Sequence, residues 1–280
     1  MPARFPFKPA TSVNEATKPL EACELLIADS QRQIWAVGNR FMIKVKPYHA
    51  GCKVEIDNVS LVQRHTNMPA PTIIRSWKDD DRFFTLQKRV PGETLEAALP
   101  RLTQQDLTKI GEDLGQHLYK MRRIQNTRME MVNGTGVVDW RLLKPVPEAR
   151  ADRYSVETDG QLAGLLAHRI RGHLEESLLE EFMSQMPSGQ PYTFSHSDLH
   201  EGNIMVKDGK FSGLIDWDLA GYYPIWWESV NATSLLDPYL SPGLACPQAL
   251  RWFNVYQAIR DAPGEAETLE KLGNYLYKHE

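Results

Sequence analysis

Polar groups that could do chemistry are concentrated in one short stretch, FSHSDLHEGNIMV at residues 194–206. It contains two histidines, two acids and an asparagine, and IDWD follows at residues 215–218. Three interpretations compete: a metal site, a phosphoryl-transfer site, or a polar loop without chemistry. Most loop acids are only solvated, but the apolar flanks TF, IMV and LI predict strands that hold this loop close to the core. The placement therefore argues against the third interpretation.

A zinc site would use His196, Asp198 and His200, which alternate along the chain and are good zinc ligands. Alternate residues share a face on a strand, but the sequence past Leu199 is typical of a loop. A single H-x-D-x-H supplies few ligands, and no other histidine or cysteine cluster completes the set. The sequence therefore disfavours zinc.

Phosphoryl transfer accounts for more of the pattern. Asp198 and Asn203 form D-x-x-x-x-N, and Asp216 follows thirteen residues after Asn203. The reaction needs a carboxylate near the acceptor hydroxyl and hard oxygen ligands for Mg²⁺, which neutralises charge on the phosphate. An aspartate base, an asparagine carbonyl and a second aspartate meet those needs. A hairpin between Asn203 and Asp216 would bring these two residues together.

The composition, with 42% hydrophobic and 24% charged residues in a chain of 280, is that of an ordinary globular protein. A net charge of −4 excludes a strongly basic nucleic-acid binder, so we expect no nucleic-acid partner. Three scattered cysteines without C-x-x-C indicate a reducing compartment. No apolar run is typical of a signal peptide or a membrane span. We expect a cytoplasmic protein without a membrane partner, and nothing in the sequence specifies an oligomeric state.

The first 90 residues predict a β-rich lobe with one helix. Apolar spacing predicts the helix over residues 53–66. Residues 15–28 fit either a short helix or a strand entry, and the Pro-rich residues 1–14 are expected to be loosely ordered. Short β-prone runs between turns predict strands at residues 34–37, 41–45, 72–77 and 82–90.

After a hinge near residues 87–92 the pattern becomes helical. A T-x-x-D capping signal begins the longest apolar stripe, and helices are predicted over residues 94–99, 103–121 and 160–186. A strand at 192–196 and an Asp-Gly hairpin of 204–206 with 211–216 surround the polar loop. The expected fold is therefore α+β with two lobes, an antiparallel-sheet lobe with one helix (residues 1–90) and a larger, mainly helical lobe (residues 91–280).

HSDLHEGN together with IDWD resembles the aminoglycoside phosphotransferase and choline kinase-like family, part of the wider protein-kinase-like fold. The stretch from FSHSDLHEGN to YYPIWWE is especially similar to the fungal branch of that family. Weaker similarity in RHTNMPAP, LQKRVPGETLE and residues 107–121 extends the resemblance over about residues 30–235. The family more often has a glycine where Ser197 precedes the aspartate. The resemblance implies a bilobal kinase-like fold that binds ATP and Mg²⁺.

The resemblance also assigns roles to the polar residues. Asp198 matches the catalytic base, and Asn203 and Asp216 match the two metal-ligand positions. His196 matches the histidine that opens the loop, and we expect it to hold the loop or the Asp216 segment in place. Asp218 would support the metal ligands without binding the metal itself.

An ATP-phosphate lysine is expected on a central strand of the N-terminal lobe, and FMIKVK offers two on one face. Lys44 is preferred, because Lys46 adjoins Pro47, where the strand should end. On the next helix, Glu55 lies on the apolar face and would pair with that lysine. The alternatives are a surface lysine and a solvated helix acid.

No Walker A motif and no G-x-G-x-x-G precedes the lysine strand. By the resemblance, a short loop at residues 29–31 would contact the phosphates through backbone amides and Ser30. The adenine would lie at the hinge, against the backbone of Gln87, Lys88, Arg89 and Val90.

We interpret the chain as an ATP- and Mg²⁺-dependent kinase that transfers the γ-phosphate to a small-molecule hydroxyl. The aromatic run GYYPIWWE at residues 221–228 is either core packing or a wall for an organic or cationic acceptor. Two alternatives stay open: a catalytically silent nucleotide-binding pseudokinase, and a kinase of choline- or ethanolamine-type amino alcohols. A protein kinase is disfavoured because D-F-G and A-P-E motifs are absent.

Overall fold

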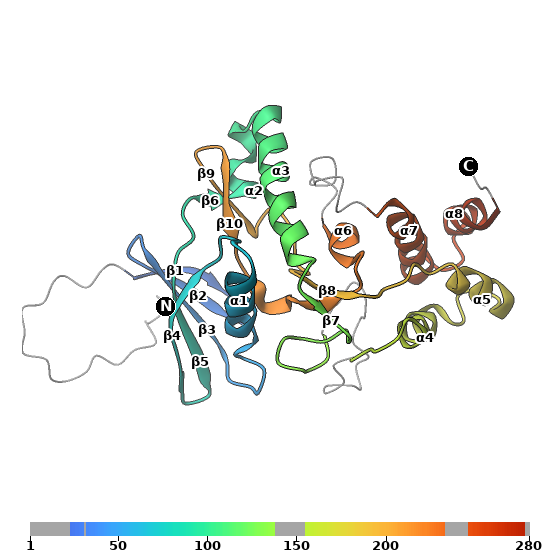
Figure 1. The fold of residues 1–280 in the computed structure, drawn as a ribbon, viewed down its shortest axis with the longest axis horizontal. Helices are drawn as coiled ribbons and strands as arrows, with labels where there is room; N and C mark the ends of the chain where they lie inside the picture. Colours follow the sequence, from blue (N-terminus) through green and yellow to red (C-terminus); the bar gives the residue numbers. More distant parts are fainter. Residues whose placement is uncertain (1–22, 31, 138–154, 233–245, 278–280) are drawn as a thin grey trace, which may run out of the picture.

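The computed structural model describes residues 23–30, 32–137, 155–232 and 246–277, so the expectation for residues 1–14 lies outside the described part. Figure 1 shows a sheet at the N-terminal side and a mainly helical part beyond it. The sheet has five antiparallel strands in the order β1-β2-β3-β5-β4. They span β1 (Cys23–Ala28), β2 (Gln33–Val37), β3 (Phe41–Pro47), β4 (Thr72–Asp79) and β5 (Arg82–Lys88). Of the ambiguous segment at residues 15–28, the described part from residue 23 forms the β1 strand, and the rest lies outside the described residues.

The two faces of this sheet differ in chemistry because successive side chains alternate. One face carries the apolar cluster of Trp35, Ile43, Val45 and Phe84, with Trp77 stacked on Phe84 at a centroid distance of 5.1 Å. The other face carries Lys44, which pairs across the sheet with Thr85. Helix α1 (Val54–His65) supplies the partner of Lys44 on that second face.

A short connection leads from the sheet to the helical part. It contains β6 (Glu93–Thr94), α2 (Leu95–Ala98), a 3-10 turn (Leu99–Arg101) and α3 (Gln104–Met121). The predicted cap of α3 is confirmed, since Thr103 and Asp106 form a complete capping box. Gly92 has φ +103°, and a Cβ there would lie 2.0 Å from the Val206 carbonyl oxygen. Only glycine fits where the connection passes this strand.

Two small sheets flank the polar loop. One contains β6, β9 (Ile204–Lys207) and β10 (Lys210–Leu214), and the other contains β7 (Gln125–Asn126), β8 (Tyr192–Ser195) and β11 (Gly221–Tyr223). The β9–β10 hairpin turns at Asp208 and Gly209 with φ +52° and +70°, as the Asp-Gly signal predicted. The polar loop therefore runs from one small sheet to the other.

The helical end contains α4 (Asp159–Ile170), α5 (Glu176–Ser184), α6 (Trp227–Asn231), α7 (Pro247–Asp261) and α8 (Ala266–Tyr277). The prediction of one helix over residues 160–186 is wrong. Arg171 turns extended at ψ 132°, and Gly172 has φ +86°, which ends α4 before α5 begins. The side chain of His173 in this break contacts the carbonyl of Ile259 on α7 at 3.0 Å.

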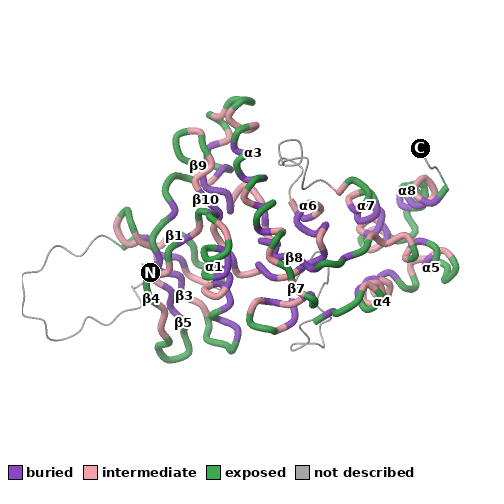
Figure 2. Tube along the Cα trace, viewed as in Figure 1, coloured by how far each residue is buried: buried purple, intermediate pink, exposed green. Residues whose placement is uncertain are grey.

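The aromatic run at residues 221–228 lies mostly in the core. Trp226, Trp227 and Tyr223 are buried, and Trp252 of α7 packs on Trp226. Figure 2 shows buried positions along α6 and β8, between the sheet and the terminal helices. Core packing is therefore the better of the two interpretations of these tryptophans. Within the described residues, every helix is too short or too polar to cross a bilayer.

Candidate active site

Asp216 follows β10 in a left-handed conformation, with φ +64° and ψ +65°. A non-glycine residue rarely adopts this conformation unless its surroundings enforce it. The Ile215 amide donates to the Asn203 carbonyl at 3.0 Å, and the Trp217 indole N–H donates to the Leu214 carbonyl at 3.0 Å. These bonds on both sides of Asp216 hold the backbone of the turn that carries it.

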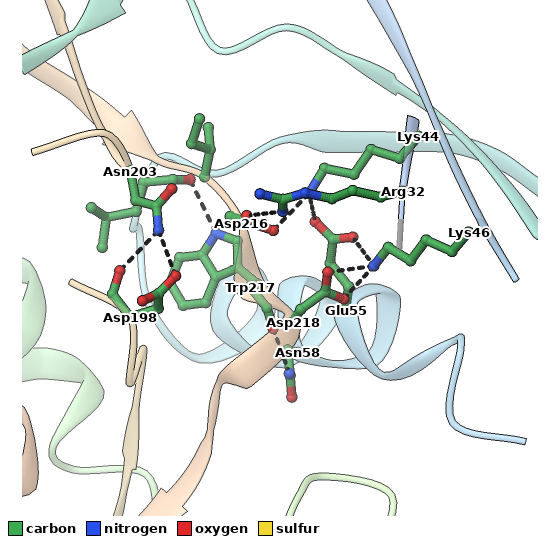
Figure 3. A network of polar contacts seen from close by, with 12 residues as sticks. Arg32, Lys44, Lys46, Glu55, Asn58, Asp198, Asn203, Asp216, Trp217 and Asp218 are labelled. Atoms are coloured by element: carbon green, nitrogen blue, oxygen red, sulfur yellow. Dashed lines mark hydrogen bonds and ion pairs between the residues drawn. The ribbon is translucent and has the colours of Figure 1, made fainter. Parts of the chain in front are cut away.

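Six charged side chains form an alternating series around Asp216, hereafter the charge chain (Figure 3). Its three cations and three carboxylates are joined in the order Arg32, Asp216, Lys44, Glu55, Lys46 and Asp218. Arg32 Nη1 lies 2.6 Å from Asp216 Oδ2, and Lys44 Nζ lies 3.1 Å from Asp216 Oδ1. The formal charges of the six groups cancel, which offsets part of the cost of burying them.

The two lysines of the FMIKVK strand both take part. Lys44 is 4% exposed and forms an ion pair with Glu55 of α1, as expected from the sequence. Lys46, to which the sequence analysis gave no role, contacts Glu55 at 3.3 Å and also pairs with Asp218. Asp218 is therefore a member of the charge chain, and its supporting role toward a metal stays a prediction.

The electrostatics of the charge chain follow from burial and from its alternating order. Burial alone would lower the pKa of Lys44, but the carboxylates of Glu55 and Asp216 raise it above its ordinary value. Burial alone would raise the pKa of Asp216, but Lys44 and Arg32 hold it well below the usual range. Burial and the nearby Glu55 raise the pKa of Asp218 despite its contact with Lys46.

The polar loop presents Asp198 beside Asn203. The Asn203 carboxamide N–H donates to the Asp198 backbone carbonyl at 2.9 Å and to its carboxylate at 3.0 Å. His200 Nε2 lies 3.7 Å from the same carboxylate. These contacts orient the Asp198 side chain while leaving it partly exposed to a cavity.

His196 is fully buried at the start of the loop. Its Nε2 lies 3.0 Å from the Ile215 carbonyl, and its ring meets Trp217 edge-on at 4.7 Å. Burial lowers the pKa of His196, which favours the neutral ring. These contacts agree with the expectation that His196 holds the Asp216 segment, and they give the zinc interpretation no support.

Helix α6 holds the backbone of the polar loop through hydrogen bonds, a contact that was not predicted from the sequence. Glu228 accepts from the amides of His196 at 2.5 Å and Ser197 at 3.4 Å, and Asn231 donates to the Ser197 carbonyl at 2.5 Å. Trp227 donates to the Ser197 hydroxyl at 2.9 Å. Ser197 has φ +65°, the conformation that glycine adopts most easily. The signal that could have revealed this contact is the placement of Glu228 and Asn231 directly after the apolar run YYPIWW.

A cavity of about 610 Å³ joins the two parts of the site. Its polar walls come from the β1–β2 loop, the charge chain and the polar loop: Asp29, Ser30, Arg32, Lys46, Asp198, Asp216 and Asp218. Ser30 thus lines the cavity, and its contact with the phosphates stays a prediction. Arg32 was missed, although a cation two residues beyond Ser30 was visible in the sequence.

The hinge residues lie apart from this cavity. Lys88, Arg89 and Val90 line a separate hollow of about 510 Å³, and the Arg89 amide already donates to the Arg40 carbonyl at 2.8 Å. Gln87 is buried, and its side-chain oxygen has no partner among the described residues. The structure therefore does not bring the expected base-binding segment and the phosphate residues into one hollow.

The donor set fits a hard divalent cation. Carboxylate oxygens of Glu55, Asp216 and Asp218 lie within 4.8 Å of one another, and Mg²⁺ prefers oxygen ligands. The expected ligand Asn203 uses its amide nitrogen on Asp198. Its backbone carbonyl accepts from the Ile215 amide at 3.0 Å, which places Asn203 next to the segment that carries Asp216.

The fold and the site together define a kinase-like phosphotransferase. Residues 30–262 match the family described as Phosphotransferase enzyme family, APH. Because the match spans most of the chain, the protein belongs to that family. No curated protein sequence matches the chain.

Solved structures support the protein-kinase-like fold. The GDP complex of wild-type aminoglycoside 2'-phosphotransferase-IIIa is 15% identical with a TM-score of 0.58, covering 92% of this chain and 93% of the other. The ADP-bound aminoglycoside phosphotransferase APH(2'')-Ib is 14% identical with a TM-score of 0.53, covering 92% of this chain and 93% of the other. A thermostable APH(4)-Ia mutant in ternary complex with AMP-PNP and hygromycin B is 15% identical with a TM-score of 0.55, covering 92% of this chain and 93% of the other. At these identities the likeness shows the fold, and the place of the chain in the fungal branch stays a prediction.

Proposed function

We propose that this phosphotransferase uses ATP and Mg²⁺ to phosphorylate a hydroxyl of a small molecule. One observation carries the proposal: Asp198, held by Asn203, lines the same cavity as Asp216 and Arg32. Residues 1–90 would form the nucleotide-binding lobe, and residues 91–280 the catalytic and acceptor-binding lobe. The proposal for base binding does not rest on this observation, because the hinge residues line a separate hollow.

In the proposed reaction Asp198 accepts the proton of the acceptor hydroxyl. The acceptor oxygen then forms a bond to the γ-phosphorus, the bond between the γ-phosphorus and its bridging oxygen breaks, and ADP leaves. Asp198 suits this role because its carboxylate is oriented by hydrogen bonds yet faces the cavity. Mg²⁺ held by Asp216, with Asn203 or Asp218, would neutralise charge on the phosphates.

The nucleotide phosphates would lie between the sheet and the polar loop. Lys44 supplies a buried positive charge whose position is set by Glu55. Ser30 lines the cavity that also contains Asp198 and Asp216. Three of the solved neighbours are complexes with GDP, ADP or AMP-PNP, which supports a nucleotide as the donor. The base would lie against the backbone of the hinge, from Gln87 to Val90.

The acceptor would be a small hydroxylated molecule and not a nucleic acid. One neighbour contains hygromycin B, which supports an organic acceptor for a protein of this fold. The apolar side of the cavity is formed by Pro47, Val54, Met131 and Leu219. These side chains could contact the carbon skeleton of an acceptor while Asp198 meets its hydroxyl.

The test is ³¹P NMR of the protein with Mg²⁺-ATP and a panel of hydroxylated amines, including choline, ethanolamine and aminoglycosides. A new phosphomonoester signal is expected, and Asp198→Ala should reduce its rate by about 10²- to 10⁴-fold, the usual contribution of a positioned base. Asp113→Ala, which removes an exposed acid on α3, is the matched control. Turnover that survives Asp198→Ala would refute the assignment. Nucleotide binding without transfer to any acceptor would indicate the pseudokinase.

A further inference from the structure

The two cations on Asp216 differ in how firmly they are held. The Lys44 side chain is 5% exposed and is also bound by Glu55. The Arg32 side chain is 34% exposed and reaches Asp216 from the β1–β2 loop (Figure 3). Arg32 is therefore the terminal cation of the charge chain and the one that can leave at the lower cost.

Both carboxylate oxygens of Asp216 have a cation partner. Lys44 Nζ lies 3.1 Å from Oδ1, and Arg32 Nη1 lies 2.6 Å from Oδ2. A divalent cation that takes Oδ2 as a ligand brings a second positive charge close to the guanidinium, and the repulsion between the two cations weakens the Arg32–Asp216 pair. Metal binding at Oδ2 and the Arg32–Asp216 pair therefore oppose each other.

We propose that Arg32 exchanges partners during the cycle, an inference that rests on the function proposed above. Arg32 pairs with Asp216 in the conformation described here and moves to phosphate oxygens of the nucleotide when a divalent cation takes its place. The guanidinium is suited to both partners, since its planar fork matches carboxylate and phosphate alike. Arg32 and Asp198 line the same cavity, so the released guanidinium stays within the proposed phosphate site.

The backbone at Arg32 is arranged for such a movement. Its amide donates to Asp29 Oδ1 at 2.8 Å, and its Nε lies 3.7 Å from Asp29 Oδ2. The amide bond thus anchors the backbone of Arg32 independently of Asp216, while Asp29 contacts the guanidinium only at the longer distance. A long side chain can then turn about its own bonds without rearranging the sheet.

This exchange couples the two ligands. A metal that binds alone must displace Arg32 without giving it a new partner, whereas a metal that binds with a nucleotide gives it the phosphates. Arg32 therefore opposes the metal alone and favours the metal–nucleotide complex. Such a coupling has a definite sign and can be measured by equilibrium binding.

The experiment compares wild-type protein with Arg32→Met. Three affinities are measured: Mn²⁺ alone by electron paramagnetic resonance, AMP-PNP in EDTA by calorimetry, and AMP-PNP with Mn²⁺ by calorimetry. The variant should bind Mn²⁺ alone about fivefold tighter, because a partly exposed ion pair contributes up to about 1 kcal/mol. It should bind AMP-PNP with Mn²⁺ roughly tenfold more weakly, for loss of a charge-assisted hydrogen bond. Binding in EDTA should change by less than about twofold, because Arg32 stays on Asp216.

The controls separate exchange from a general loss of charge. Arg75→Met removes an arginine of β4 that lies over the ring of Trp77, and all three affinities should stay at wild-type values. Arg32→Lys keeps the charge and guards against a folding defect; it should restore the wild-type Mn²⁺ affinity but only part of the complex affinity.

Two results would overturn the exchange. Equal weakening of AMP-PNP binding with and without Mn²⁺ would make Arg32 a plain phosphate ligand. Unchanged affinity for Mn²⁺ alone would mean that Arg32 does not compete with the metal. Wild-type protein that binds no nucleotide in either condition would overturn the proposed function first, and the exchange with it.

Discussion

The charge chain and the polar loop meet in one cavity, but they are held by different kinds of interaction. The charge chain consists of side chains that pair with other side chains, so its members can change partners. The polar loop is held through its backbone, by Glu228 and Asn231 of α6. Backbone capture fixes where Asp198 lies, while side-chain pairing leaves Arg32 and Lys46 able to follow a ligand.

This difference separates two requirements of phosphoryl transfer. The group that takes the proton must be in place before the acceptor arrives, because misplacement by about 1 Å is costly. The groups that meet the phosphates must instead accommodate charge that arrives with the nucleotide and leaves with ADP. The first requirement suits a loop whose backbone is held by buried side chains, as in the polar loop. The second suits ion pairs that can change partners, as in the charge chain.

The largest expected effect comes from breaking the charge chain at its centre. Lys44→Met leaves Glu55 with Lys46 alone and Asp216 with Arg32 alone, so the cluster keeps one uncompensated negative charge. We expect a loss of about 3 kcal/mol in the free energy of unfolding and about 100-fold in kcat/KM. Urea denaturation and steady-state kinetics measure the two quantities.

The matched variant for this prediction is Lys46→Met, which removes a cation nearer the end of the charge chain. It should cost less stability than Lys44→Met, because Lys44 continues to satisfy Glu55. Equal losses for the two variants would show that position in the charge chain does not matter, and the contrast between centre and ends would then be wrong.

The contact of Glu228 with the backbone of the polar loop should make the free energy of unfolding depend on pH. Burial raises the pKa of Glu228 to about 7 from an ordinary value near 4.5. Between these values the folded state holds a proton that the unfolded state has released. The stabilising contribution of Glu228 is therefore complete below the pKa of the unfolded state and is lost as pH rises through 7. From about pH 5 to pH 8 the loss should reach about 2 kcal/mol.

The measurement compares the pH dependence of unfolding in wild-type protein and in Glu228→Gln, which cannot titrate. The wild type should lose stability relative to the variant as pH rises over this window. Parallel curves would mean that Glu228 keeps the same charge throughout. Other titrating groups contribute equally to both proteins and cancel in the difference.

Much of the sheet and its nearest helix could be predicted, because local patterns specify them. Strand alternation and turn residues gave the β2–β3 and β9–β10 hairpins, and Thr103 with Asp106 gave the start of α3. The long helix over residues 160–186 was wrong because a single glycine, Gly172, outweighs an apolar pattern that continues across it. A hydrophobic period shows which residues are buried, but not where the chain turns back.

The site divides in the same way. Lys44 and Glu55 were predictable, since one follows an apolar strand and the other lies on the apolar face of the next helix. Arg32 and Glu228 were not, because their partners Asp216 and His196 lie 184 and 32 residues away. Local spacing shows that both residues are present but does not identify their partners. Contacts of this kind depend on how the sheet, the polar loop and α6 come together.

The smallest expected effect tests how Asp216 is positioned from α1. Asn58 donates at 2.8 Å to the carbonyls of Trp217 and Ala220, while its own side-chain oxygen is buried without a partner among the described residues. Asn58→Leu loses two hydrogen bonds but also removes that unsatisfied oxygen, so the two effects largely offset. We expect a net loss of about 1 kcal/mol in stability.

The kinetic result of Asn58→Leu decides more than its stability. If α1 positions the turn that carries Asp216, metal–nucleotide affinity should weaken a fewfold while metal-free nucleotide affinity stays constant. The control is Ser60→Ala, which removes an exposed hydroxyl from the same helix. An unchanged metal–nucleotide affinity would show that the hydrogen bonds of Ile215 and Trp217 hold Asp216 without help from α1. Positioning of the metal ligand would then be a property of the β10 segment alone.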